Sequence, residues 1–251
     1  MKFSKIFLLS TLILIAGAFL PYNDLMGYEN VADSPSAAPS HQIWDGLLKK
    51  YVTSSGKVNY KGLKNEEAKL DQYIALLAKA TPQSSWGRNA SMAYWINAYN
   101  AFTVKLILEN YPLGSITKLD KPWDTKFIKL AGASYSLNQI ENQIIRPTYK
   151  DARIHFAVNC AAKSCPKLLN EAFTASKLNS QLEKQSRAFV NNMVANSLSK
   201  DAVQISKIFD WYKDDFTSNG GVVAFLKKYS TKEISDQAAV SYRAYNWNLN
   251  E

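Results

Sequence analysis

One stretch of the chain restricts the fold more than any other, because it is too apolar to lie at a surface. It runs from Tyr94 to Phe102, reads YWINAYNAF, and places apolar side chains nearly all round a helix. A helix of that kind is buried inside a domain. We therefore predict a buried helix that begins at Ser84 or Ser85 and continues to about Leu108.

This helix contains two amides, Asn97 and Asn100, three residues apart on one face. A buried amide without partners costs about 1–3 kcal/mol, so both are expected to be hydrogen-bonded. Core amides most often hold neighbouring backbone in place. The alternative is functional: Asn97 supports an oxyanion or orients a catalytic imidazole, and Asn100 contributes to binding.

The composition predicts one helix-rich α+β domain with a small, mostly antiparallel sheet over residues 41–251. The chain has 251 residues, of which 47% are hydrophobic and 12% aromatic, which suffices for one sizeable core. Periodicity and turn residues predict helices at 41–52, 66–80, 138–145, 174–194, 207–216 and 222–229, and strands at 127–130, 134–137, 153–159, 203–206 and 240–249.

The first residues have the pattern of an export signal. Lys2 and Lys5 precede an apolar run, and Ala16 and Ala18 supply the small residues of a cleavage site. We predict a signal peptide over 1–18, a disordered linker over 19–40, and no membrane span after cleavage. The protein is then periplasmic or secreted.

The net charge is +9. A basic protein favours anionic partners, such as an anionic cell-envelope polymer or peptide. Nucleic acid is not expected, because the lysines are scattered and no basic run follows a phosphate backbone.

The segment from Arg153 to Pro166 is the richest in chemistry. It holds both cysteines and one of the two histidines, and its alternation predicts a strand that places His155 on the face opposite Ile154 and Phe156. A Cys160–Cys165 disulfide fits an exported protein. A Cys160 nucleophile with His155 as its base is the alternative.

Metal and redox chemistry have weaker support in this segment. Zinc needs about four ligands, and one histidine with two cysteines supplies three. The C-x4-C spacing differs from the C-x-x-C of thiol exchange. We predict no metal and no cofactor.

A further segment, Ile140 to Arg146, places Glu141 and Arg146 on a short helix that Pro147 is expected to end. Glu141 either forms an ion pair with the body of the protein or orients a base. Arg146, Arg153 and Ser164 are candidate binding residues. The other histidine, His41, is expected to be exposed and without a role.

Four segments in this order resemble the uncharacterised family catalogued as domain of unknown function 547, over roughly residues 85–250. They are Tyr94–Ala101, Ser136–Arg146, Arg153–Pro166 with Cys160 and Cys165, and Tyr245–Asn250. The family occurs in exported bacterial proteins and in plants and has no settled activity. Its order of a buried helix followed by strands is loosely similar to papain-like and transglutaminase-like folds.

Two positions depart from the family pattern. Asn142 stands where a histidine commonly follows the glutamate, and Asn246 where an aspartate commonly precedes the tryptophan. Two functions remain open. The first is a cysteine-dependent hydrolase or acyl transferase on peptide or amide bonds, with Cys160, His155, and Glu141 or Asn97 as its catalytic residues. The second is a non-catalytic periplasmic binding or scaffold domain stabilised by the Cys160–Cys165 disulfide.

Overall fold

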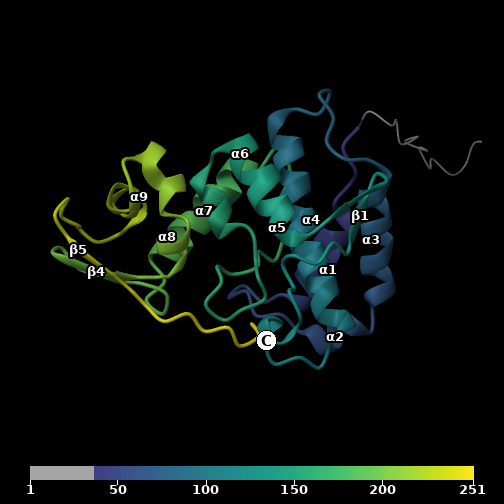
Figure 1. The fold of residues 1–251 in the computed structure, drawn as a ribbon, viewed down its shortest axis with the longest axis horizontal. Helices are drawn as coiled ribbons and strands as arrows, with labels where there is room; N and C mark the ends of the chain where they lie inside the picture. The colour runs from purple at the N-terminus through teal and green to yellow at the C-terminus, as the bar shows by residue number, and fades with distance from the viewer. Residues whose placement is uncertain (1–36) are drawn as a thin grey trace, which may run out of the picture. The chain divides into compact units, whose positions relative to one another are not determined.

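The computed structural model describes residues 37–251, so the predicted signal peptide and most of the predicted linker lie outside the described residues. The first described elements are helices α1 (Gln42–Tyr51), α2 (Tyr60–Lys64), α3 (Glu67–Lys79) and α4 (Arg88–Glu109) (Figure 1). Helices α2 and α3 pack against α4, and every residue of α4 from Met92 to Val104 is buried. The predicted central helix is confirmed. It begins at Arg88, a few residues later than expected.

A hairpin and a helical run follow α4. After the short helix η1 (Ile116–Lys118), strands β1 (Ile128–Leu130) and β2 (Ala133–Tyr135) pair antiparallel. The run consists of α5 (Leu137–Gln139), the π-helical η2 (Ile140–Ile145) and α6 (Arg146–Tyr149).

Pro147 does not end this run, contrary to prediction. The wide π turn lets the Arg146 amide donate to the Glu141 carbonyl five residues back, and a new α-helical turn starts there. Pro147 stands in that first turn, where its missing N–H is tolerated.

The predicted strand at 153–159 is wrong, because this segment forms the 3-10 helix η3 (Ala152–Phe156). Its apolar residues alternate because they serve two cores: Ile154 packs into the large cluster around α4, and Phe156 into a second cluster. A helical turn sends consecutive side chains in different directions. His155 is therefore buried along with both of its neighbours.

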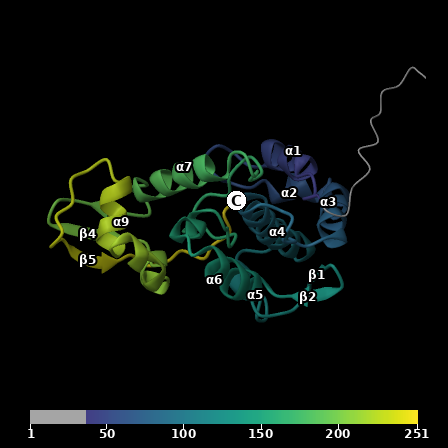
Figure 2. The ribbon, with the colours of Figure 1, turned by 90° about the horizontal axis from the view of Figure 1, so that it is seen from above.

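The second cluster lies among the C-terminal elements and is rich in phenylalanine. These elements are α7 (Leu178–Val190), β3 (Ser197–Leu198), β4 (Ala202–Ile205), α8 (Ile208–Trp211), η4 (Lys213–Asn219), α9 (Val222–Tyr229) and β5 (Ala239–Tyr242). The strand order is β3-β4-β5, with β3–β4 antiparallel and β4–β5 parallel. Figure 2 shows α7 running between the α1–α4 helices and this group.

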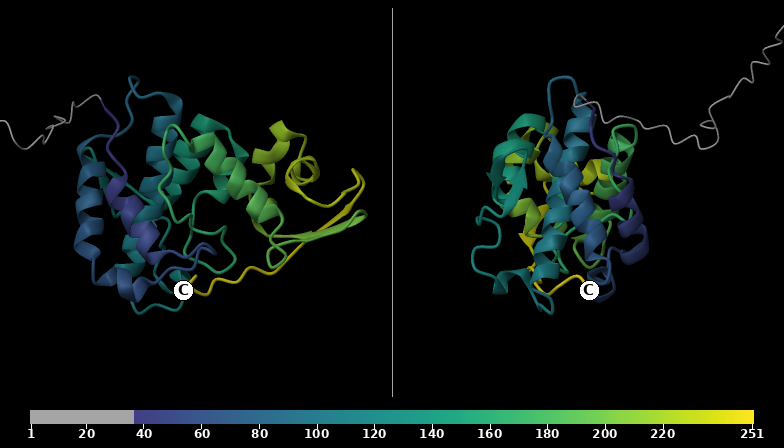
Figure 3. Two further views of the ribbon diagram at one scale, coloured as in Figure 1. Left: turned by 180° about the vertical axis from the view of Figure 1, so that it is seen from behind. Right: turned by 90° about the vertical axis from the view of Figure 1, so that its right-hand side faces the viewer.

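The chain beyond β5 returns to the first helices, as Figure 3 shows from behind. The predicted strand over 240–249 stops at Tyr242. The rest is held by backbone hydrogen bonds and one antiparallel bridge, Ala162 to Leu249: the Leu249 amide donates to Gly114 O at 3.0 Å, the Asn250 amide to Ala161 O at 3.1 Å, and the Lys163 amide to Asn248 O at 2.7 Å. The fold is a helix-rich α+β domain, as predicted. No helix within residues 37–251 is long and apolar enough to cross a membrane.

Candidate functional site

A cavity of about 370 Å³ lies where these separate segments meet. Its walls come from α4, the α5–η2 run, η3, the cysteine loop, α8 and the C-terminal segment. Six of its lining residues are aromatic: Tyr99, Trp123, Trp211, Tyr212, Tyr245 and Trp247. The volume is that of a small-molecule site.

Four of these rings contact one another, three pairs at steep angles and Trp211 with Trp247 nearly parallel, at 26° and 5.9 Å between centroids. Trp247 meets Trp123 at 63° and Tyr245 at 52°, with ring centroids 5.4 and 4.5 Å apart. Trp211 lies 4.9 Å from Tyr245 and is 45% exposed, which is high for so large an apolar ring. The pairs that meet at an angle present π faces in more than one direction at the cavity.

Glu141 provides a carboxylate in this aromatic lining. It is 6% exposed, and the hydroxyl groups of Tyr99 and Tyr212 are hydrogen-bonded to it. Burial, and then the charge of Glu141, raise the pKa of both tyrosines well above its ordinary value. Both hydroxyls therefore keep their protons and donate them toward the carboxylate.

Beside Glu141, the Asp215 carboxylate joins an arginine to a histidine. Arg146 reaches it through Nε at 2.6 Å and Nη2 at 3.0 Å, and His155 Nε2 lies 2.6 Å from Oδ2. Burial raises the pKa of Asp215, but the bonds from His155 and Arg146 outweigh burial and hold that pKa below its usual range. Asp215 is thus ionised and only accepts.

The state of His155 follows from this pairing. Since Asp215 only accepts, His155 Nε2 carries a proton. The imidazole lies against the Tyr212 ring at 3.9 Å, and its Nδ1 is buried without a hydrogen-bond partner. In the neutral imidazole Nδ1 is a free acceptor on a residue that lines the cavity.

Arg146 also holds the side chain of Asn142. Its Nη1 donates to Asn142 Oδ1 at 2.7 Å, while the Asn142 amide contacts Asn138, one turn earlier. Asn138 and Asn142 both line the cavity. The position where the family commonly has histidine therefore carries a neutral side chain bound to the Arg146–Asp215 pair.

The two cysteines form a disulfide with an S–S distance of 2.12 Å, and both line the cavity. In this state Cys160 has no thiolate, so the nucleophile prediction concerns only the reduced protein. Buried Asn159 shapes the loop, donating to Pro166 O at 2.7 Å and accepting from the Ala161 amide at 2.9 Å.

Ser164 ties this loop to the C-terminal segment. Its hydroxyl accepts from the Asn246 amide at 2.8 Å, and Asn246 Oδ1 accepts from the Asn248 amide at 3.0 Å. An aspartate could accept the same bond, so the family's common residue and Asn246 can hold this turn alike.

Asn97 and Asn100 do not line the cavity. Asn97 donates to Phe173 O at 2.8 Å and accepts from the Phe173 amide at 3.0 Å. Asn100 similarly donates to Ala157 O at 2.9 Å and accepts from the Asn159 amide at 2.8 Å. Both amides thus hold backbone, which is the more common of their two predicted uses.

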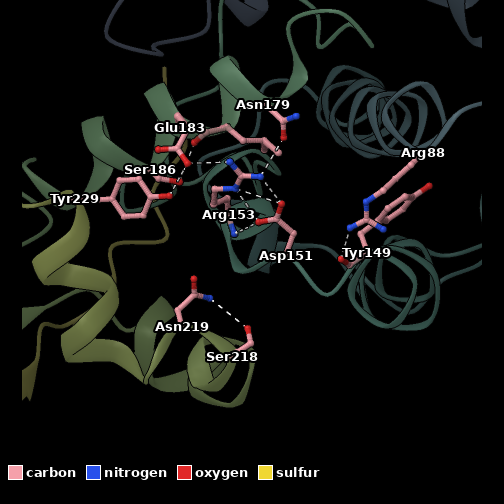
Figure 4. A network of polar contacts seen from close by, with 11 residues as sticks. Arg88, Tyr149, Asp151, Arg153, Asn179, Glu183, Ser186, Ser218, Asn219 and Tyr229 are labelled. Carbon is pink, nitrogen blue, oxygen red and sulfur yellow. Dashed lines mark hydrogen bonds and ion pairs between the residues drawn. The ribbon is translucent and has the colours of Figure 1, made fainter.

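Arg153 is also absent from the cavity. Figure 4 shows its guanidinium among Asp151, Glu183 and Asn179, with Nη2 at 2.6 Å from Asp151 Oδ2 and Nη1 at 2.9 Å from Glu183. Tyr229 shares Glu183, at 2.9 Å. This network joins η3 to α7 and α9, so Arg153 ties the framework together.

The expectation for His41 is wrong. Its Nδ1 lies 2.8 Å from the Tyr73 hydroxyl, and burial lowers the pKa of His41 to about 4. Its position just before α1 places it against α3, where it is partly buried.

Sequence reasoning missed Asp215, Tyr99 and Tyr212. Tyr99 lies in the buried helix motif, and Tyr245 and Trp247 lie in the C-terminal motif. The motifs therefore indicated these positions, but they did not indicate that the three side chains line one cavity. Nothing in the sequence singles out Asp215 among the acidic residues. Within residues 37–251, no group of three His, Cys, Asp or Glu side chains could hold a metal ion.

Fold and site together define an α+β domain with an aromatic, carboxylate-bearing cavity walled on one side by a disulfide loop. Residues 83–190 match the model of a family described as "Protein of unknown function, DUF547". The match confirms the resemblance; it includes Glu141, His155 and both cysteines and leaves out Asp215 and the C-terminal aromatics. Comparison with curated proteins and with solved structures finds no match.

Proposed function

We propose that this protein is an exported, non-catalytic domain that binds a small ligand in its aromatic cavity. The observation that carries the proposal is the wall of that cavity, where six aromatic residues meet a disulfide in place of a free thiol. A cavity of this size with few polar groups suits reversible binding. The disulfide and the basic, apolar leader together support export to an oxidising compartment.

The cavity does not favour the anionic partner suggested by net charge. Its lining includes no lysine or arginine, and Glu141 gives it a negative charge. The excess of positive charge therefore lies elsewhere on the protein and supports solubility or surface contacts rather than this site.

A screen of small molecules by thermal shift tests the binding proposal. We expect at least one class to raise the melting temperature of the oxidised protein and to change its tryptophan fluorescence. Trp211→Ala, at a partly exposed wall position, should remove the shift. Met193→Ala, 80% exposed and outside the cavity, is the control. No shift across a chemically broad set would contradict the proposal.

A second function, a cysteine hydrolase or acyl transferase of the reduced protein, is favoured by one specific arrangement. His155 is oriented by Asp215 through Nε2, has a free Nδ1, and lines the same cavity as Cys160. A histidine held by a carboxylate, with its other nitrogen free, is the base of a nucleophilic triad. On this reading Asp215 orients the base, the part that the sequence reasoning gave to Glu141 or Asn97.

The matched cysteine variants separate the two functions. Cys165→Ala leaves Cys160 as a free thiol without any reductant, and Cys160→Ala leaves Cys165. If the second function holds, Cys165→Ala turns over amide or ester substrates and Cys160→Ala does not. Equal inactivity of both variants would exclude Cys160 catalysis.

A further inference from the structure

We infer that the cavity takes a positively charged organic ammonium group, held between the aromatic rings and the carboxylate of Glu141. This inference rests on the proposed binding function and gives it a ligand class. Three independent features support it: an unbalanced charge, unused hydrogen-bonding capacity, and the geometry of the rings.

The charge is unbalanced because Glu141 has no cation of its own. Within residues 37–251 no ion pair joins it to a basic side chain, and the nearby Arg146 is bound in two places by Asp215. Arg146 and Asp215 balance one another, so Glu141 is left without an ion-pair partner among these residues. A nearly buried carboxylate is costly unless a partner neutralises it, and a bound cation would do so.

Glu141 and His155 both leave buried hydrogen-bonding capacity unused among the described residues. Tyr99 and Tyr212 direct their protons toward Glu141, which leaves carboxylate lone pairs unused. His155 Nδ1 is a buried nitrogen with no hydrogen-bond partner. Unpaired buried polar groups call for an explanation, and a ligand that donates hydrogen bonds or carries positive charge would explain these.

The rings add a surface that attracts cations. The π faces of tryptophan and tyrosine carry negative charge density and bind ammonium groups, with tryptophan the strongest. Trp123, Trp211 and Trp247 supply this surface at the cavity, with Tyr245 inclined to both Trp211 and Trp247, which stack on each other. A neutral sugar would use the same rings by stacking, but would leave the charge of Glu141 without a counter-ion.

Calorimetric titration of the oxidised full chain tests the inference with paired probes. Choline is compared with 3,3-dimethylbutan-1-ol, which has its shape without the charge, and butylammonium distinguishes a primary from a quaternary ammonium source. A neutral disaccharide is the competing ligand class. We expect the cations, or one of them, to bind at least about tenfold more tightly than the neutral isostere.

Two variants locate the effect. Glu141→Gln keeps the side-chain size and should weaken cation binding about tenfold while leaving the neutral isostere unchanged. Glu233→Gln removes an exposed carboxylate, 75% accessible, and should change neither. Trp211→Ala gives a second, fold-tolerant loss of affinity if Glu141→Gln proves unstable.

The outcomes separate this inference from the function beneath it. Equal binding of choline and its isostere, or binding of the disaccharide alone, would overturn the cation and leave a ligand-binding cavity. If none of the four probes binds but the broad thermal screen finds a ligand, the cation is likewise overturned and the ligand-binding cavity stands. If neither experiment detects binding, the proposed binding function is overturned as well.

Discussion

Two sets of buried polar residues lie a short way apart along this chain, and they differ in how completely they are bonded. Asn97 and Asn100 on α4 each donate and accept at a backbone partner. Glu141 and His155 are nearly as buried, yet within residues 37–251 Glu141 has no ion-pair partner and His155 Nδ1 has no hydrogen-bond partner. Complete bonding marks groups that hold a fold together, and incomplete bonding at a cavity marks groups available to a ligand.

The largest expected effect comes from removing a satisfied amide. Asn97→Ala leaves the Phe173 amide and carbonyl without partners, so we expect a loss of about 3 kcal/mol in the free energy of unfolding. Urea denaturation measures it. Asn219→Ala, at an exposed position, should change stability by less than about 0.5 kcal/mol. A similarly small effect of Asn97→Ala would remove the basis of the comparison.

The disulfide is expected to contribute next. The double variant Cys160→Ala/Cys165→Ala should lose about 2 kcal/mol, because the bridge closes a short loop and restricts the unfolded chain only modestly. Denaturant unfolding without reductant measures the loss. If stability were unchanged, the hydrogen bonds of Asn159 and Ser164 alone would hold this wall of the cavity.

A smaller effect concerns pH and His41, a partly buried histidine that does not line the cavity. Its pKa is about 4 in the folded protein against an ordinary 6.5, so the unfolded chain binds the additional proton between these values. Stability is therefore fully present above pH 6.5 and falls as pH drops toward 4, by about 1 kcal/mol for a group partly open to solvent. Melting temperatures across this range give the slope. His41→Gln should reduce the change of melting temperature with pH. An unchanged slope would mean that another group causes the pH dependence.

The smallest effect on stability should come from Glu141. Glu141→Gln removes a charge that nothing in the described residues neutralises, so the unfolding free energy should change by less than about 1 kcal/mol in either direction. The same denaturation assay applies. A loss as large as that of Asn97→Ala would show that Glu141 stabilises the fold. It would then count against a role for Glu141 in binding a ligand.

Much of the fold was accessible from sequence because it follows from local pattern. The all-apolar run at 94–102 fixed the central helix, and the hairpin at 128–135 followed from its turn residues. The predicted strand at 153–159 was wrong because its apolar residues alternate between two cores on either side of one helical turn. Periodicity cannot distinguish that pattern from a strand. The prediction that Pro147 ends the helix was wrong because a π turn precedes it and a new α-helical turn begins there. No local sequence signal marks the π turn.

The candidate site was only partly accessible, because it depends on encounters between distant segments. Glu141, His155 and the cysteines were found by residue type, and all of them line the cavity. Asp215 was not, since its role exists only where η4 meets η3 and α6. Asn97 was expected either to hold backbone or to serve a catalytic base, and it is bonded to the Phe173 backbone, a choice that spacing alone cannot make.

The cavity draws its walls from residues as far apart as Tyr99 and Trp247. Such a site has a kinetic consequence, because the entropy of closing long loops must be met before any wall contact forms. Helix α4 can form early, whereas the cavity is complete only when the last segment has docked. A ligand would then bind the finished fold and not its precursors, and would shift the folding equilibrium toward the native state in proportion to its concentration.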